Sequence, residues 1–151
     1  MSPCWFLWEA EDMYKLSNRS KNKLQGVHPD LIKVVKRAIQ ICKVDFGVSE
    51  GLRSFKRQKI AFKLGYSKTM NSRHLKQKDG YSYAVDLFVL VEGKINWQHK
   101  HFRYVIQAMM TAAIESGVQI RAGGLWRDFV DSPHFELNRS YYLARSPSLR
   151  T

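Results

Sequence analysis

The chain has 151 residues, of which 44% are hydrophobic and 25% are charged. These values are typical of a globular protein and exclude a disordered chain, so we expect one domain over residues 1–151. No apolar run of about 18 residues is present, which excludes a membrane span. The first residues lack the basic start of a secretory signal. Cys4 and Cys42 form no Cys-x-x-Cys pair, so we expect reduced thiols and no disulfide framework.

The formal net charge of +12 predicts an anionic partner. Nucleic acid, an acidic membrane surface and an anionic cell-wall polymer all satisfy this condition, and charge alone does not choose between them. A solvated basic surface without a specific partner satisfies it as well.

The first half of the chain predicts two helices with a strand between them. Apolar residues recur at helical spacing over residues 31–42, and Pro29 suits the first helical turn, where its missing N–H would have no partner. Residues 44–48 alternate as in a strand, and a second helix is expected over residues 54–64, before Gly65. Outside these elements, the aromatic residues 1–16 are expected to cover a core edge. Residues 17–23 are expected to form a polar loop and residues 66–80 a basic loop.

In the second half, residues 83–91 are the strongest strand candidate, followed by a turn and a short returning strand over residues 95–97. A third helix is expected over residues 99–116, ending at Gly117. Short strands are expected at 118–121 and 134–137, with a loop at 122–126 between them. The Arg- and Ser-rich tail, residues 138–151, is expected to fray. Helices and short strands thus interleave, without an internal repeat or an interdomain linker.

Two stretches contain the residues suited to chemistry. His74, Asp86 and His134 offer two imidazoles and one carboxylate, a mixture that suits catalytic zinc, where three protein ligands leave a position for water. Asp131 lies three residues before His134, close enough to take a proton from such a water and return it to a leaving amine. A lone histidine is more often a surface or core residue, and we apply that interpretation to His28, His99 and His101. Asp86 taken alone is equally compatible with a strand-end cap.

The order Ser-x-His, Ala-x-Asp, Asp-x-x-His resembles the zinc peptidases that cleave peptidoglycan stem peptides. These include D-alanyl-D-alanine carboxypeptidases and the L-alanyl-D-glutamate endopeptidases that phages use as endolysins. The resemblance runs from Leu24 to Leu137 and is closer to the endolysin branch. The segments that carry it are Leu24-Gln-Gly-Val-His-Pro-Asp-Leu31, Glu50-Gly-Leu-Arg-Ser54 with Gln58, Ser67-Lys-Thr69, Ser72-Arg-His74, Ala84-Val-Asp-Leu87, Gly123-Gly-x-Trp126 and Asp131-Ser-Pro-His-Phe-Glu-Leu137.

This resemblance implies a small α+β domain of the D-alanyl-D-alanine carboxypeptidase type, with an antiparallel sheet flanked by helices and Zn²⁺ in a cleft at the sheet. It implies hydrolysis of the L-alanyl-D-glutamate bond of the peptidoglycan stem. The implied roles are zinc ligands for His74, Asp86 and His134, catalytic base for Asp131, oxyanion contact for Arg53 and substrate contacts for Ser72 and Trp126. For Ser72 a local backbone cap, and for Trp126 a core position, are competing interpretations.

The sequence departs from the family pattern at three places. Residues 75–81 stand where the family has two residues, and we expect them to bulge outward as a loop. Ser82 replaces a usual glycine. Leu125 replaces a residue that is commonly acidic in the endolysin branch, which affects fine substrate contacts and not the metal site.

We expect a monomer that binds peptidoglycan and no nucleic acid, accumulates in the host cytoplasm and reaches the wall through a holin-like pore. A D-alanyl-D-alanine carboxypeptidase with the same site is an alternative, although Asp-Ser-Pro-His favours the endopeptidase. A basic nucleic-acid-binding protein would account for the charge but not for the ordered His and Asp residues. A wall-binding module that keeps zinc without activity is a third alternative, against which the intact Asp131 argues.

Overall fold

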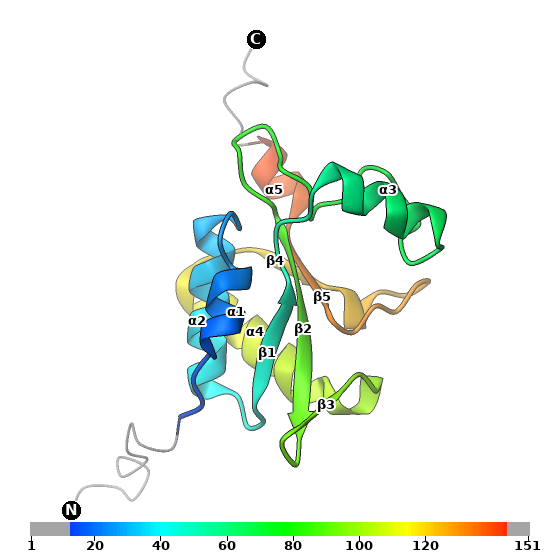
Figure 1. Cartoon of the computed structure of the whole chain (residues 1–151). Coiled ribbons are helices and arrows are strands. Elements are labelled where there is room, and N and C mark those ends of the chain that lie inside the picture. The colour runs from blue at the N-terminus through cyan, green and yellow to red at the C-terminus, as the bar shows by residue number, and fades with distance from the viewer. Residues whose placement is uncertain (1–12, 145–151) are drawn as a thin grey trace, which may run out of the picture.

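Strand β2 (Ala84–Val91) is the centre of the fold in the computed structural model, which describes residues 13–144. It pairs antiparallel with β1, β3 and β5, and the strand order is β1-β2-β5-β4 (Figure 1). The other elements are α1 (Asn18–Lys23), α2 (Pro29–Ile41), β1 (Phe46–Glu50), α3 (Phe55–Lys63), β3 (Lys94–Asn96), a 3₁₀ turn (His99–His101), α4 (Arg103–Ser116), β4 (Ile120–Ala122), a 3₁₀ turn (Gly123–Leu125), β5 (His134–Leu137) and α5 (Arg139–Ala144).

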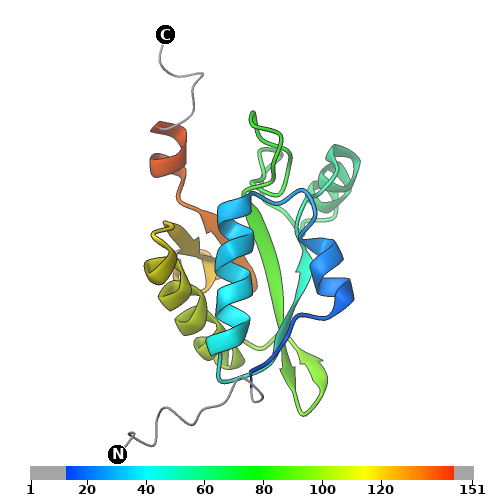
Figure 2. The same cartoon turned by 90° about the vertical axis from the view of Figure 1, so that its left-hand side faces the viewer.

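The two faces of β2 differ because side chains alternate along a strand. Val85, Leu87 and Val89 are fully buried and belong to the hydrophobic core. Helices α2 and α4 pack against each other on this face (Figure 2). Asp86 has the opposite parity and therefore lies on the other face, which is where the candidate site is found.

A β-bulge in β1 brings an acidic side chain to that second face. Val48 pairs with Leu87, but the next pairing joins Glu50 to Asp86, so Ser49 is an extra residue in the strand. Without this shift, Glu50 would have the same parity as the core residues Phe46 and Val48. A bulge commonly re-aims a side chain in this way beside a functional site.

Most predicted elements are confirmed. Helices α2 and α3 and strands β2 and β5 lie where the sequence predicted them, and Ser54 caps α3 by accepting from Arg57 N–H. Helix α4 ends at Ser116 as predicted but begins at Arg103, because the first residues of the predicted helix, His99–His101, form a 3₁₀ turn. Glu92 and Gly93 form the hairpin turn with positive φ values of 52° and 76°, as a two-residue turn requires. Strands β1 and β4 each begin two residues later than predicted, and the loop expected at 122–126 contains a 3₁₀ turn.

Two predictions about the ends of the domain are wrong. The expected loop at 17–23 is helix α1, whose Ser17 side chain accepts from Ser20 N–H, while Ser20 Oγ accepts from Val48 N–H of β1. Residues Arg139–Ala144, within the expected frayed tail, form α5, and Tyr142 donates to Asp30 at the start of α2 (2.7 Å). The rest of the expected aromatic segment and of the tail, residues 1–12 and 145–151, lies outside the described residues. Of the described helices, none has the length and apolar content that crossing a membrane requires.

Candidate active site

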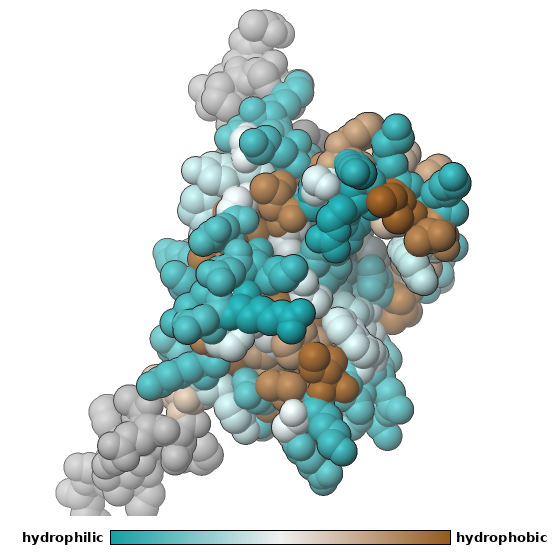
Figure 3. All heavy atoms as spheres, viewed as in Figure 1, coloured by the Kyte–Doolittle hydropathy of each residue, from teal (hydrophilic) through white to brown (hydrophobic). Residues whose placement is uncertain are grey.

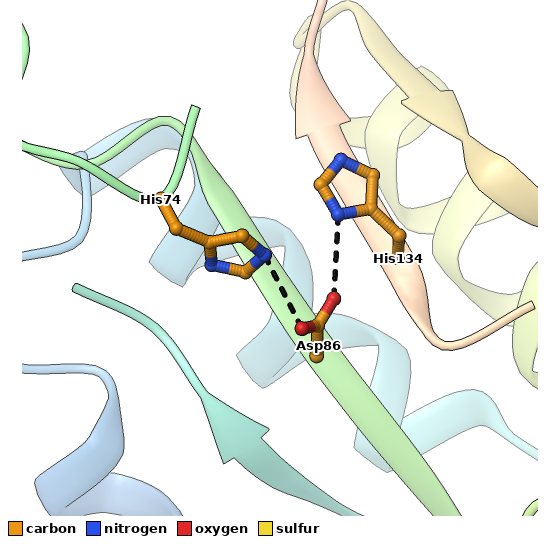
Figure 4. Close-up of side chains that lie close together, drawn as sticks. All are labelled: His74, Asp86 and His134. Carbon is orange, nitrogen blue, oxygen red and sulfur yellow. Dashed lines mark hydrogen bonds and ion pairs between the residues drawn. The ribbon is translucent and has the colours of Figure 1, made fainter. Parts of the chain in front are cut away.

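Three neighbouring strands place three polar residues in one row. Glu50 of β1 lies opposite Asp86 of β2, and Asp86 lies opposite His134 of β5. His74 reaches the same point from the loop before β2 (Figure 4). His74 Nε2 lies 3.3 Å from Asp86 Oδ2, and His134 Nδ1 lies 3.3 Å from Asp86 Oδ1. The Asp86 carboxylate therefore stands between the two imidazoles.

Each imidazole is oriented by a second partner. His74 Nδ1 lies 2.9 Å from the carbonyl oxygen of Gly51, to which it can only donate, so Nε2 carries the free lone pair. His134 Nε2 lies 2.8 Å from Oε2 of Glu136, a residue that is 1% exposed. Metal-binding histidines usually have such a carbonyl or carboxylate partner, which fixes the ring and its tautomer.

The carboxylates of Asp86 and Glu136 favour a positive charge at His134. Burial alone would lower the pKa of His134, but its contacts with Asp86 and Glu136 raise that pKa to about 9. Burial would raise the pKa of Asp86, yet the neighbouring His74 and His134 hold it well below its usual range. Asp86 is therefore ionised, and the pair of carboxylates around His134 stabilises a cation at this point.

The residues present fit a metal ion. Ligand atoms of His74, Asp86 and His134 all lie within 4.8 Å of one another. His74 Nε2 is buried and has no hydrogen-bond partner among residues 13–144, a costly condition that a metal–nitrogen bond relieves. These three residues could therefore hold a metal ion, as the sequence predicted.

Asp131 lies in the same cleft but takes no part in that cluster. Its backbone is fixed, because Asp131 N–H donates to Gly123 O and His134 N–H donates to Asp131 O. Burial raises the pKa of the Asp131 carboxyl, and the negative charge of Asp86 raises it further. A carboxylate with a raised pKa is a better proton acceptor, so the position and chemistry of Asp131 suit a general base.

Arg53 is held beside the cluster by three hydrogen bonds. Its Nε and Nη2 donate to both oxygens of Glu50 (3.0 and 2.6 Å), and its Nη1 donates to Gln58 Oε1 (2.7 Å). Nη2 is also 3.8 Å from Asp86 Oδ2. One N–H on each of the two Nη atoms remains for a substrate oxygen. The oxyanion role of Arg53 stays a prediction that this geometry permits.

Ser72 and Trp126 also line the cleft. Ser72 Oγ accepts from His74 N–H (3.2 Å), which is the local backbone cap that competed with a substrate role. The Trp126 ring lies 5.2 Å from the His134 ring and is half-buried, so it forms a wall of the cleft beside a candidate ligand.

The cleft has a volume of about 380 Å³ and brings together every site residue that the sequence predicted. These residues are Arg53, Ser72, His74, Asp86, Trp126, Asp131 and His134. The insertion at 75–81 folds into a separate turn, closed by hydrogen bonds from Gln77 N–H to Tyr81 O and from Gly80 N–H to Gln77 O. It therefore leaves the two ligands on either side of it together, as expected.

Two residues that orient the imidazoles, Glu136 and Gly51, were not predicted from the sequence. A signal existed for Glu136, because residues two apart on a strand share a face and His134-Phe-Glu136 opens β5. Gly51 acts through its carbonyl oxygen, and no sequence pattern indicates which backbone carbonyl will meet a histidine.

A His-Asp-His cluster with buried imidazoles and a separate carboxylate nearby, in a cleft on a small antiparallel sheet, is the type of site that hydrolases with a single metal ion use. The family is then clear from comparison. The chain belongs to the phage L-alanyl-D-glutamate peptidases, whose family model matches residues 13–143. The resemblance to the endolysin branch is confirmed.

Two relatives agree with this assignment. The chain is 30% identical over 132 residues to the L-alanyl-D-glutamate peptidase of Escherichia phage T5, a match that covers 85% of this chain and 93% of that protein. It is also similar to the crystal structure of the L-Ala D-Glu endopeptidase ChiX of Serratia marcescens, with a TM-score of 0.76 and 36% identity, over 85% of this chain and 93% of that one. The α+β fold with an antiparallel sheet is thereby confirmed.

Proposed function

We propose that this protein is a zinc-dependent endopeptidase that hydrolyses the L-alanyl-D-glutamate bond of peptidoglycan stem peptides. The observation that carries the proposal is the convergence of His74, Asp86 and His134 in a cleft that also contains Asp131, within a chain of this peptidase family. The relatives from Escherichia phage T5 and Serratia marcescens described above are both named for that bond.

Zinc is the metal that this donor set favours, because two imidazoles and one carboxylate are its usual ligands in hydrolases. Zinc bound there would polarise the carbonyl of the scissile bond and lower the pKa of a water molecule. Asp131 would accept the proton of that water and then give it to the leaving amine of D-glutamate. Arg53, fixed by Glu50 and Gln58, would donate to the carbonyl oxygen as negative charge develops on it.

The direct test combines metal analysis with product analysis. Purified protein and the variants His74→Ala, Asp86→Ala and His134→Ala would be assayed for bound zinc and for digestion of soluble muropeptides, with products identified by mass spectrometry. We expect each variant to lose both zinc and cleavage. His101→Ala is the matched control, because His101 lies outside the cluster and should keep both.

The product identity separates the candidate reactions. An endopeptidase releases a peptide with a new amino-terminal D-glutamate, whereas a D-alanyl-D-alanine carboxypeptidase releases free D-alanine. Release of D-alanine alone would contradict the proposal. A His134→Ala protein with full zinc and full cleavage would remove that residue from the ligand set.

A further inference from the structure

One buried carboxylate beside the site is surrounded by more positive charge than it can neutralise. Glu136 Oε2 is engaged by His134, while Oε1 lies 3.2 Å from Arg139 Nε and 3.7 Å from Arg121 Nη1. A third guanidinium, that of Arg73, lines the same cleft as Glu136 and Arg139. Two arginines thus lie close to one glutamate that a histidine already shares, and a third lines the same cleft.

Arg73 is the most unusual of the three. It is 8% exposed, and its guanidinium lies over the Tyr83 ring at 4.6 Å. Its Nη1 donates to Gln77 Oε1, but Nε and Nη2 have no partner among the described residues. Arg73 and Arg139 line the same cleft. Two cations in one cleft, with N–H groups that have no acceptor among the described residues, are the reverse of a stabilising ion pair.

Arg139 is the accessible member of this group. It comes from α5 and, like Arg73, lines the cleft that contains His74, Asp86 and His134. Arg121 does not line this cleft. Its Nε is fixed by Glu136, and no bond from its two Nη atoms is found within residues 13–144. Glu136 therefore holds the guanidinium fork of Arg139 in place and joins it through His134 to the candidate metal site.

We propose that Arg139, supported by the buried charge of Arg73, is a specificity-determining residue that binds the free α-carboxylate of the D-glutamate next to the scissile bond. The inference rests on the proposed function. In an L-alanyl-D-glutamate bond the chain continues through the side-chain carboxyl of D-glutamate, so its α-carboxylate is free and sits on the same carbon as the scissile nitrogen. It must lie in the cleft beside the metal when the bond is positioned for attack.

The chemistry of the pair is favourable. A guanidinium presents two parallel N–H groups that match a carboxylate, and such charge-assisted pairs are both stronger and more directional than neutral hydrogen bonds. The carboxylate would also neutralise the excess positive charge around Glu136. An amide at the same position, as in a stem that carries D-isoglutamine, would have no charge to offer.

The test compares two soluble stem peptides that differ only in this group, one with D-glutamate and one with D-isoglutamine. For wild-type protein we expect the D-glutamate stem to have the higher kcat/KM. Arg139→Ala should lower kcat/KM about 10- to 100-fold for the D-glutamate stem, the usual contribution of a hydrogen bond to a charged group. It should lower the value for the D-isoglutamine stem by no more than about 3-fold, because most of that contribution depends on the missing charge. Arg139→Lys should restore only part of the difference, since it keeps the charge but not the fork.

Arg121→Ala is the matched control, because Arg121 is another guanidinium near Glu136 that does not itself line the cleft, and the contact it loses with the Trp126 ring (5.5 Å) is the same for both stems. It should leave the ratio of the two substrates at the wild-type value. Equal losses on both stems in Arg139→Ala would mean that Arg139 acts through Glu136 on His134, and unchanged kinetics would mean no role; either result overturns the inference. Failure of the proposed function looks different, because wild-type protein would then cleave neither stem.

Discussion

Asp131 is the residue whose proposed role can be separated most cleanly from metal binding. It lies outside the His74, Asp86 and His134 cluster, and its backbone hydrogen bonds do not depend on its side-chain charge. Asp131→Asn should therefore keep the metal and the fold. We expect kcat to fall by a factor of about 10²–10⁴, the usual contribution of a general base. Steady-state kinetics with parallel metal analysis checks this, and near-normal turnover with the metal bound would refute the assignment.

For single residues, the sequence was most informative where the residue's own side chain is suited to the chemistry. The convergence of His74, Asp86, Asp131 and His134 in one cleft could be predicted because candidate metal ligands and bases are restricted to few residue types in a recognisable order. Glu136 and Arg139 were missed because their importance arises from their contacts. A glutamate in a strand and an arginine in a tail are ordinary until the fold places one against His134 and the other against that glutamate.

Helix α1 affects the site because its last residue, Lys23, lies close to the backbone of Gly51. It packs beside β1, and a Cβ added at Gly51 would meet the backbone oxygen of Lys23, at the end of α1, at 2.2 Å. The carbonyl of Gly51 is also the group that orients His74. Glycine at position 51 thus allows α1 to pack against the end of β1 while the carbonyl of residue 51 contacts His74.

Gly51→Ala should therefore damage stability and metal binding together. We expect a loss of about 1–3 kcal/mol in the free energy of unfolding, as for other overpacked sites, and a fall of about 10- to 100-fold in metal affinity as His74 loses its orienting carbonyl. Thermal melts and metal titration measure the two effects. Gly47→Ala, in β1, is the control, because the three atoms nearest to its added Cβ all belong to the Phe88 ring, a side chain that can move. An equal loss of metal affinity in Gly47→Ala would contradict this explanation.

The elements that escaped prediction share a physical cause. Helix α1 has six polar or basic residues and no apolar periodicity; beyond the local Ser17 cap, the hydrogen bond from Val48 N–H to Ser20 Oγ ties it to β1. Helix α5 is short and is anchored to α2 by Tyr142. The bulge in β1 depends on pairing with β2. Each is fixed by tertiary contacts that override local propensity, whereas α2, α4 and β2 carry their patterns within their own sequences.

Over the whole molecule the positive charge is unevenly distributed. Residues 51–78 contain no Asp or Glu, and their nine basic residues are Arg53, Lys56, Arg57, Lys59, Lys63, Lys68, Arg73, Lys76 and Lys78. The segment includes α3 and one rim of the cleft. In the view of Figure 3, which is that of Figure 1, hydrophilic side chains cover much of the surface, and hydrophobic ones lie between them around α3. Attraction to an anionic wall would therefore act at the side of the molecule that carries the cleft.

This distribution predicts a salt-dependent effect on whole walls. Long-range attraction is screened over about 8–10 Å at moderate salt, so lysis of walls should weaken from low salt to several hundred millimolar, while cleavage of a small stem peptide should change much less. Replacing Lys56, Lys59 and Lys63 of α3 by Gln should reduce wall lysis and its salt dependence.

The same charge change elsewhere is the control. Replacement of Lys33, Lys36 and Lys43, in α2 and the turn after it, should have a smaller effect on wall lysis. A parallel loss for walls and peptides would show that salt acts on the site itself. A nucleic-acid-binding protein would instead retain DNA with steep salt dependence and cleave neither substrate.

The row of Glu50, Asp86 and His134 has a consequence for the order of events during synthesis. Its members come from three strands that are separated by long stretches of chain, and His134 of β5 is the last of the three in chain order. Contacts between distant parts of a chain form late, because closing the intervening loops costs entropy before the contacts repay it. No ribosome-bound fragment that ends before β5 can contain the complete site. The complete row therefore forms only after β5 has been synthesised and has paired with β2.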